Sequence, residues 1–278
     1  MKTEHCEKIT CKYCGSNIVS KCGNYNNIPR FWCKVCKRKF KADNYLFHMG
    51  IPAECVYITL DMYYRGESIS DIRMFLMQEF SYLPSRTIIY EWIQKYTDKA
   101  TAIFKSGLPQ VGDLWILGET VRKLAGRHRK FYDIVDAQTH YLLATQIALV
   151  HSNSVIKSLV EDAKRTAGKR PDTIMTLVNY SYFDKIKKIL DCEAEFLHFL
   201  QPEAQKNIHI IKCFVNVFEP RYKIIRNIKN PARLSSIMQG WSLYYNYFQK
   251  QSELADKTPA DTAGISYSIK GWQDLKFS

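Results

Sequence analysis

The sequence predicts a multidomain α+β and α/β protein built from three consecutive modules. Three observations support this fold class. Six of the nine cysteines fall within the first 36 residues. Apolar residues then recur at helical spacing through a segment with several capping residues. Short apolar runs alternate with helical patterns in the remainder of the chain, which is typical of an α/β sheet. We expect the modules to span residues 1–48, 49–105 and 106–278.

Composition and charge favour an anionic partner. The chain has 278 residues, 46% of them hydrophobic, and a net charge of +13. Residues 1–50 contain ten Lys or Arg and three acidic residues, a net charge of +7. No apolar run approaches the roughly 20 residues of a membrane span, and the first residues lack the apolar core of a signal peptide. We therefore expect nucleic acid rather than a membrane as the partner, and a cytoplasmic, nucleoid-associated location.

Two C-x-x-C motifs predict a metal site in the first module. Cys11-Lys-Tyr-Cys14 and Cys33-Lys-Val-Cys36 are separated by 18 residues. Each motif offers two thiolates on one tight turn, and together they can close a tetrahedral four-sulfur site. The spacing is typical of a zinc ribbon with one structural zinc, and four free cysteines are the weaker alternative. Two further cysteines, Cys6 and Cys22, are expected to be ordinary thiols, although Cys6 can substitute for a ligand.

A basic run follows the second motif. Residues 30–32 are expected to form a short strand before the motif. The run after it combines one aromatic residue with four cations, which suits contact with phosphates. The predicted phosphate-contacting residues are Lys37, Arg38, Lys39 and Lys41.

The second module reads as a helix-turn-helix domain. Pro52 can open a first helix and Gly66 can close it. Ser68 can cap a second helix and Ser85 a third, with residues 82–84 as the turn between them. In such a domain the last helix enters the major groove of DNA. A plain three-helix domain with a polar outer face is the alternative.

The predicted DNA-reading face of the third helix carries side chains spaced four residues apart. Arg86, Tyr90 and Gln94 project side by side, and Thr87 and Lys95 flank them. Arg and Gln can pair with guanine and adenine edges. Glu91 on the same helix counts against a close approach of phosphate.

The third module follows a predicted linker at residues 106–109. We expect strands at residues 114–117, 130–135, 141–150, 172–178 and 195–200, and helices at residues 153–167 and 182–190. Residues 221–233 are strongly basic and can lie along a DNA backbone.

The chain as a whole resembles insertion-sequence transposases. The matching residues are Trp115 with Gly118-Glu119-Thr120, the run from Ile134 to Ala144, the run from Gly240 to Phe248, and the run from Thr258 to Ile265. The resemblance implies a ribonuclease H-like core in which two Asp and one Glu hold two magnesium ions for strand cleavage and transfer.

The three metal-binding acids of that family are replaced in this sequence. Gly118, Leu177 and Lys212 stand at their positions, with 34 residues between the last two (212 − 177 − 1). Magnesium needs hard anionic oxygens, so we expect no magnesium and no catalysis. The histidines at 140, 151, 198 and 209 show no ligand spacing.

The sequence therefore predicts a non-enzymatic, transposase-derived protein that binds duplex DNA in a regulatory or architectural role. We expect a homodimer or higher homo-oligomer. Two alternatives stay open at this point. One is an active transposase with a rebuilt metal site, and the other is a protein-interaction scaffold with vestigial DNA binding.

Overall fold

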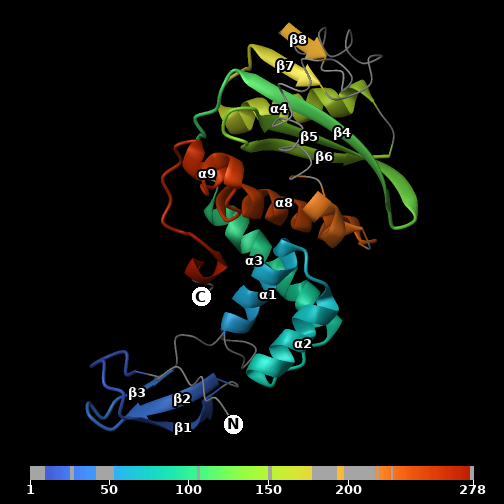
Figure 1. The fold of residues 1–278 in the computed structure, drawn as a ribbon. Coiled ribbons are helices and arrows are strands. Elements are labelled where there is room, and N and C mark those ends of the chain that lie inside the picture. Colours follow the sequence, from blue (N-terminus) through green and yellow to red (C-terminus); the bar gives the residue numbers. More distant parts are fainter. Residues whose placement is uncertain are drawn as a thin grey trace. The chain divides into compact units, whose positions relative to one another are not determined.

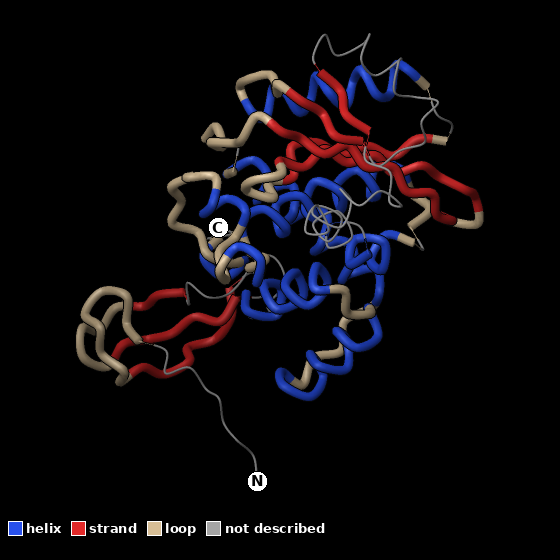
Figure 2. Tube along the Cα trace, turned by 45° about the horizontal axis from the view of Figure 1, so that its top comes forward, coloured by secondary structure: helices blue, strands red, loops and turns tan. Residues whose placement is uncertain are grey.

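The described part of the chain forms two separate sheets and a set of helices (Figure 2). The computed structural model describes residues 10–25, 28–41, 53–104, 107–149, 152–176, 193–196, 217, 219–226 and 228–275. The chain divides into two compact units. One contains residues 1–59 with 276–278, and the other contains residues 60–275.

The first unit contains a small antiparallel sheet. Its strands are β1 (Val19–Tyr25), β2 (Ile28–Cys33) and β3 (Lys39–Lys41), in the order β1-β2-β3. Phe31 of β2 pairs with Phe40 of β3, and their ring centroids lie 6.0 Å apart. Both rings pack with Cys11 and Cys33 in a core too small to fold alone. The predicted strand at residues 30–32 is confirmed as part of β2.

Three helices follow, at the positions that the capping residues predict. They are α1 (Ala53–Arg65), α2 (Ile69–Phe80) and α3 (Arg86–Ile103). The Ser68 hydroxyl accepts a hydrogen bond from the backbone N–H of Asp71, and the Ser85 hydroxyl accepts one from Ile88. Each bond satisfies an amide that the first turn of a helix leaves without a partner.

α3 packs directly on the last long helix of the chain, α8 (Pro231–Tyr247), and Tyr64 of α1 stacks on Tyr244 of α8 with ring centroids 6.1 Å apart. The Tyr64 hydroxyl lies 2.7 Å from the Thr97 hydroxyl, and Gly240 of α8 lies against this pair. A Cβ atom at Gly240 would overlap the Tyr64 hydroxyl and lie 2.5 Å from Thr97 Cγ2. Glycine is therefore required there for the helices to approach one another.

The chain contacts the rest of the second unit at the end of the predicted linker, residues 106–109. Gln110 N–H donates to the Ala263 carbonyl at 2.8 Å, and Pro109 is buried. Because α3 also packs on α8, the helices α2 and α3 of the second predicted module and the sheet of the third lie within one unit, whereas the boundary between the units falls inside α1, after Thr59.

The second unit is built on a mixed five-stranded sheet with the order β6-β5-β4-β7-β8. Antiparallel pairing joins β4 (Leu114–Leu124), β5 (Arg127–Asp136) and β6 (Leu142–Ala148). β7 (Thr173–Thr176) and β8 (Glu193–Phe196) run parallel to β4. α4 (Asn153–Ala167) covers one face, and α8 packs along the edge strand β6 (Figure 1). This mixed α/β layering confirms the third part of the predicted fold class.

The predicted elements match the sheet in part. The helix at residues 153–167 is confirmed at both ends. β4 begins at Leu114 as expected, but it continues to Leu124 because it forms a long hairpin with β5. β8 begins at Glu193, before the predicted start at residue 195. The predicted helix at residues 182–190 lies outside the described residues.

Short elements complete the chain after α8. They are the 3-10 turns η2 (Ser252–Leu254) and η3 (Trp272–Asp274) and the helix α9 (Pro259–Thr262). Thr258 and Asp261 form a reciprocal capping box at α9. No helix among the described residues is both long and apolar enough to cross a membrane.

Candidate functional site

The four cysteines that the sequence singles out come together in one cluster. Their sulfur atoms all lie within 4.8 Å of one another. Cys11 Sγ lies 3.5 Å from Cys36 Sγ, and Cys14 Sγ lies 3.6 Å from Cys33 Sγ. A tetrahedral zinc ion with Zn–S bonds of about 2.3 Å requires sulfurs about 3.8 Å apart, so the cluster fits zinc. Among the described residues, this is the one group of three or more His, Cys, Asp or Glu that can hold a metal ion.

Both C-x-x-C turns have the same backbone shape. The residue after the second cysteine, Gly15 in one turn and Lys37 in the other, has a positive φ of 68° and 59°, respectively. The Cys36 amide points at Cys33 Sγ at 3.5 Å. Such turns aim two sulfurs and several backbone N–H groups at a common point, which favours thiolates.

The pKa values of the two thiols in the second turn, Cys33 and Cys36, are shifted in opposite directions. Burial acts to raise the pKa of Cys33, but hydrogen bonds from the Cys36 and Val35 backbones lower it to about 6. For Cys36, the backbone of Arg38 acts to lower the pKa, but burial and three neighbouring sulfurs raise it to about 11. A divalent cation would stabilise all four thiolates together. Cys22 is exposed and outside the cluster, and Cys6 lies outside the described residues.

The predicted phosphate-contacting run lies on the surface of the same unit. Lys37, Arg38 and Lys39 are exposed. The Arg38 guanidinium lies 5.1 Å from the centre of the Tyr13 ring, and the Lys37 ammonium lies 5.3 Å from that of Trp32. Lys41 ends β3. This surface combines cations with aromatic faces, a combination suited to nucleic acid.

α8 contacts part of the predicted DNA-reading row of α3 and leaves the rest exposed. Arg86 is exposed, and its Nη2 donates to Ser70 Oγ at 3.1 Å. Tyr90 is half-buried, with the Arg233 guanidinium 4.8 Å from its ring centre. Gln94 is half-buried too, and its backbone carbonyl accepts a 3.5 Å hydrogen bond from the Ser236 hydroxyl of α8.

A different row of α3 is open to solvent. Thr87, Glu91 and Lys95 are exposed and follow one another at four-residue spacing. Two of the five predicted contact residues of this helix, Thr87 and Lys95, thus lie on the open row.

The Gly118 position lies on the face of the sheet opposite α4. Gly118 is buried in β4 and pairs with Asp133 of β5, so both residues face the same way. Arg221 donates to the two carboxylate oxygens of Asp133 at 2.5 and 2.6 Å and to the Thr145 hydroxyl at 2.9 Å. The side chains of Arg221 and Asp133 are fully buried.

Sequence reasoning missed this buried ion pair. The available signal was Asp133, a carboxylate inside the apolar run of residues 131–135. Glu119, the neighbour of Gly118, faces the α4 side and forms a 2.5 Å ion pair with Lys130. Asp136 accepts hydrogen bonds from the backbone of Gly112 and from Thr139, so it fixes a turn.

The comparisons with known proteins find transposases for insertion sequences. The transposase for insertion sequence-like element IS431mec of Staphylococcus aureus is 23% identical over 198 residues, covering 68% of this chain and 85% of that protein. The transposase for insertion sequence element IS257 in transposon Tn4003, also from S. aureus, is 24% identical over 152 residues. The match covers 52% of this chain and 65% of that protein. The chain is distantly homologous to these transposases. No protein-family model matches it.

Two solved structures show a weaker likeness. The HTLV-2 integrase catalytic core domain, in complex with magnesium and in dimeric form, is 16% identical. Its TM-score is 0.38, covering 56% of this chain and 97% of that chain. The catalytic core domain of BIV integrase is 7% identical, with a TM-score of 0.39. The match covers 54% of this chain and 92% of that chain.

The prediction that the chain is not an enzyme is wrong, because the proteins to which it is distantly homologous are transposases, which are enzymes. That prediction depended on Gly118, Leu177 and Lys212. Gly118 lies within the described residues, and residues 177 and 212 lie outside them. The expectation that no magnesium binds, and the regulatory or architectural role derived from inactivity, lose the same basis.

Proposed function

We propose that this chain is a transposase-type enzyme that binds duplex DNA and acts in DNA recombination. The observation that carries the proposal is the similarity to an insertion-sequence transposase over 198 residues, which cover 85% of that protein. The net charge of +7 in residues 1–50, next to a four-cysteine cluster that fits zinc, supports the DNA-binding part.

The proposed DNA contacts come from the first two predicted modules. Residues 1–48 form a zinc ribbon that contacts phosphates through Lys37, Arg38, Lys39 and Lys41. Residues 49–105 form a helix-turn-helix domain, in which α3 enters the major groove. Thr87 and Lys95 lie on its open row, Arg86 lies at its start, and Tyr90 and Gln94 border α8. Residues 106–278 form the ribonuclease H-like module.

Salt dependence tests the binding proposal. The zinc-loaded chain is titrated against a fluorescent duplex between 50 and 200 mM salt, and the dissociation constant is measured by anisotropy. If several phosphates are contacted, the logarithm of affinity falls linearly with the logarithm of salt concentration. An affinity that hardly changes over this range would refute phosphate binding and favour the protein-interaction scaffold.

A strand-cleavage assay tests the enzymatic part. The purified chain is incubated with duplex DNA and magnesium or manganese, and we expect metal-dependent strand cleavage. Among the described residues near Gly118, Asp133 is the carboxylate on the same face, but its pair with Arg221 must open before it can bind a metal ion. Asp133→Asn is therefore compared with Glu119→Gln, which changes the opposite face. DNA binding without cleavage in either metal would refute the enzymatic part alone.

The proposal includes self-association on chromosomal DNA. Helix-turn-helix proteins commonly bind as dimers whose symmetry matches that of the site. Light scattering of the chain bound to DNA should then give the mass of two chains, or a higher even number, per duplex. Crosslinking of the chain to nucleoid DNA in cells tests the proposed location.

A further inference from the structure

A cavity of about 370 Å³ lies within the unit of residues 60–275. The turn between α1 and α2, the start of α3, and the helical residues 219–225 with Arg226 meet around it. Three cations line it, Arg86, Lys223 and Arg226, against one carboxylate, Glu67. No ion pair joins any of the three cations to a carboxylate among the described residues. The residues around the cavity therefore carry a net charge of +2, three cations less Glu67.

The walls of this cavity are held in place by buried contacts. The buried Tyr63 hydroxyl of α1 donates to the Ile224 carbonyl at 3.1 Å. The Tyr90 ring of α3 meets the Tyr63 ring edge-on, with centroids 6.5 Å apart. All three residues line the cavity. Because the walls are already fixed, a ligand would not have to order them on binding.

The polar groups at the cavity suit an anion with several acceptor oxygens. Arg86 extends toward α2 and donates to Ser70 Oγ at 3.1 Å. Ser70 and Ile69 open α2, where the first amides have no intrahelical partner and the helix dipole is positive. Asp71 also lies in this first turn, but its carboxylate accepts from the Ser68 hydroxyl at 2.6 Å and does not line the cavity. Arginine forks match the geometry of phosphate oxygens.

We propose that this cavity binds a backbone phosphate of duplex DNA, with Arg86, Lys223 and Arg226 as the cationic contacts. The three side chains are exposed, so the cavity opens to the surface and admits a phosphate that is still part of a strand. The inference rests on the proposed DNA binding and adds a contact from outside the two N-terminal modules. It also makes Arg86 a phosphate contact instead of a base-reading residue.

The test uses the full zinc-loaded chain and duplexes of unrelated sequence. Lys223→Gln, Arg226→Gln and Arg86→Ala are compared with Lys250→Gln, an exposed lysine after α8 that does not line the cavity. We expect each cavity variant to lower the slope of log affinity against log salt, by no more than about 0.9, the value for one whole phosphate contact. The fold loss in affinity should be the same on every duplex. Lys250→Gln should leave the slope unchanged.

Melting temperature and zinc content of each variant confirm that the fold is intact. If wild-type affinity depends on salt but the cavity variants keep the wild-type slope, this inference is overturned and the proposed DNA binding stands. If wild-type affinity does not depend on salt, the proposed function itself fails. If Arg86→Ala loses affinity for one duplex sequence only, Arg86 reads bases there and is not a phosphate contact of the cavity.

Inorganic phosphate distinguishes the source of the anion. Thermal shifts are measured in phosphate and in chloride at equal ionic strength. Suppose that phosphate stabilises the wild-type chain but not Arg226→Gln, and that Arg226→Gln keeps the wild-type slope of log DNA affinity against log salt. The cavity would then be a site for free phosphate, and the DNA assignment would be overturned. A lowered DNA slope with or without such stabilisation supports it.

Discussion

Replacement of Arg221 by methionine should be strongly destabilising. The Arg221 guanidinium makes two hydrogen bonds to Asp133, and both side chains are fully buried. Methionine removes the charge and leaves the Asp133 carboxylate in the interior without this partner. Breaking one side of a buried pair costs about 3–5 kcal/mol. For a unit of residues 60–275, that loss corresponds to a melting temperature lower by about 6–20 °C.

A matched surface pair and a double substitution sharpen this test. Arg122 donates to Glu219 at 3.0 Å, but the two side chains are 43% and 50% exposed. Arg122→Met should therefore cost less than about 1 kcal/mol. The double variant Arg221→Met/Asp133→Leu removes both charges, so its cost should fall below the sum of the single costs by about 2–3 kcal/mol.

Urea unfolding followed by tryptophan fluorescence measures these free energies. Trp115 and Trp241 are fully buried in the same unit and report on its packing. The reasoning is refuted if Arg221→Met costs no more than Arg122→Met, or if the costs of the two buried substitutions simply add.

Three further changes probe the metal site and the packing of α8. Cys33→Ser should abolish binding of one zinc ion per chain and weaken DNA binding, measured by metal analysis and anisotropy. Gly240→Ala should destabilise the chain by about 1–3 kcal/mol, because its methyl group overlaps the Tyr64 hydroxyl. Asn246→Asp should cost about 1–3 kcal/mol, because the side-chain amide donor that bonds the Leu142 carbonyl at 3.0 Å is lost. Urea unfolding measures both stability changes.

Each of these changes has a control. Cys22→Ser removes an exposed thiol outside the cluster and should leave the zinc content unchanged. A Cys33→Ser chain that still holds one zinc ion would contradict the four-cysteine site. Gln239→Ala places the same methyl group on the exposed side of α8 and should be neutral or slightly stabilising. Equal effects of Gly240→Ala and Gln239→Ala would contradict the close approach of the helices.

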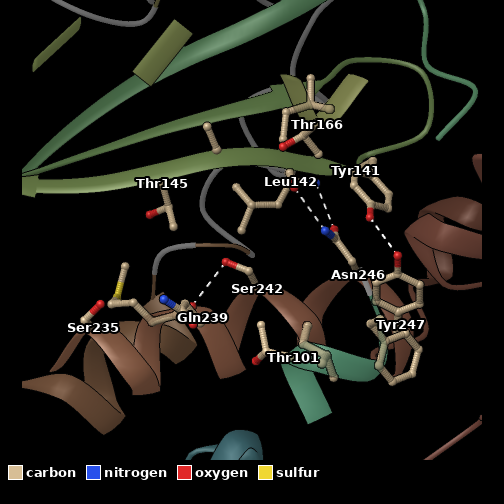
Figure 3. Close-up of a pocket in the computed structure, with 15 residues that line it drawn as sticks. Thr101, Tyr141, Leu142, Thr145, Thr166, Ser235, Gln239, Ser242, Asn246 and Tyr247 are labelled. Atoms are coloured by element: carbon tan, nitrogen blue, oxygen red, sulfur yellow. Dashed lines mark hydrogen bonds between the residues drawn. The ribbon is translucent and has the colours of Figure 1, made fainter. Parts of the chain in front are cut away.

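The Asn246 test concerns the outer edge of β6. The Asn246 side chain accepts from Leu142 N–H at 2.9 Å and donates to the Leu142 carbonyl, as a neighbouring strand would (Figure 3). It lies at a cavity of about 420 Å³ between β6 and α8, where Tyr141 and Tyr247 share a 3.1 Å hydrogen bond. Tyr247→Phe removes only that hydroxyl contact and should cost less than Asn246→Asp. The opposite order would show that the edge bond contributes little.

Features set by local chemistry were predictable from the sequence. Ser68 and Ser85 begin helices because a serine hydroxyl satisfies amides two or three residues further along. The span of α4 followed from its apolar periodicity and its flanking cap and glycine. The cysteine cluster followed from the spacing of two short turns, since each turn brings its own pair of sulfurs together.

Features set by distant partners were not predictable in the same way. Arg86, Tyr90 and Gln94 share one side of α3, but helical periodicity does not reveal that α8, more than 130 residues later, covers part of that side. The contact between Gly118 and Asp133 depends on the register of a long hairpin, in which a shift of one residue would turn Asp133 to the opposite face.

The sequence by itself determined the four-cysteine cluster, the helix caps and the distant relationship to transposases. These depend on residue types at fixed, short spacing or on similarity along the whole chain. Only the tertiary structure decided which side of α3 is open, that Arg221 neutralises Asp133 beside Gly118, and that Arg86 meets Lys223 and Arg226 at one cavity. The physical reason is that burial and charge pairing depend on distances between segments far apart in the chain, which folding alone sets.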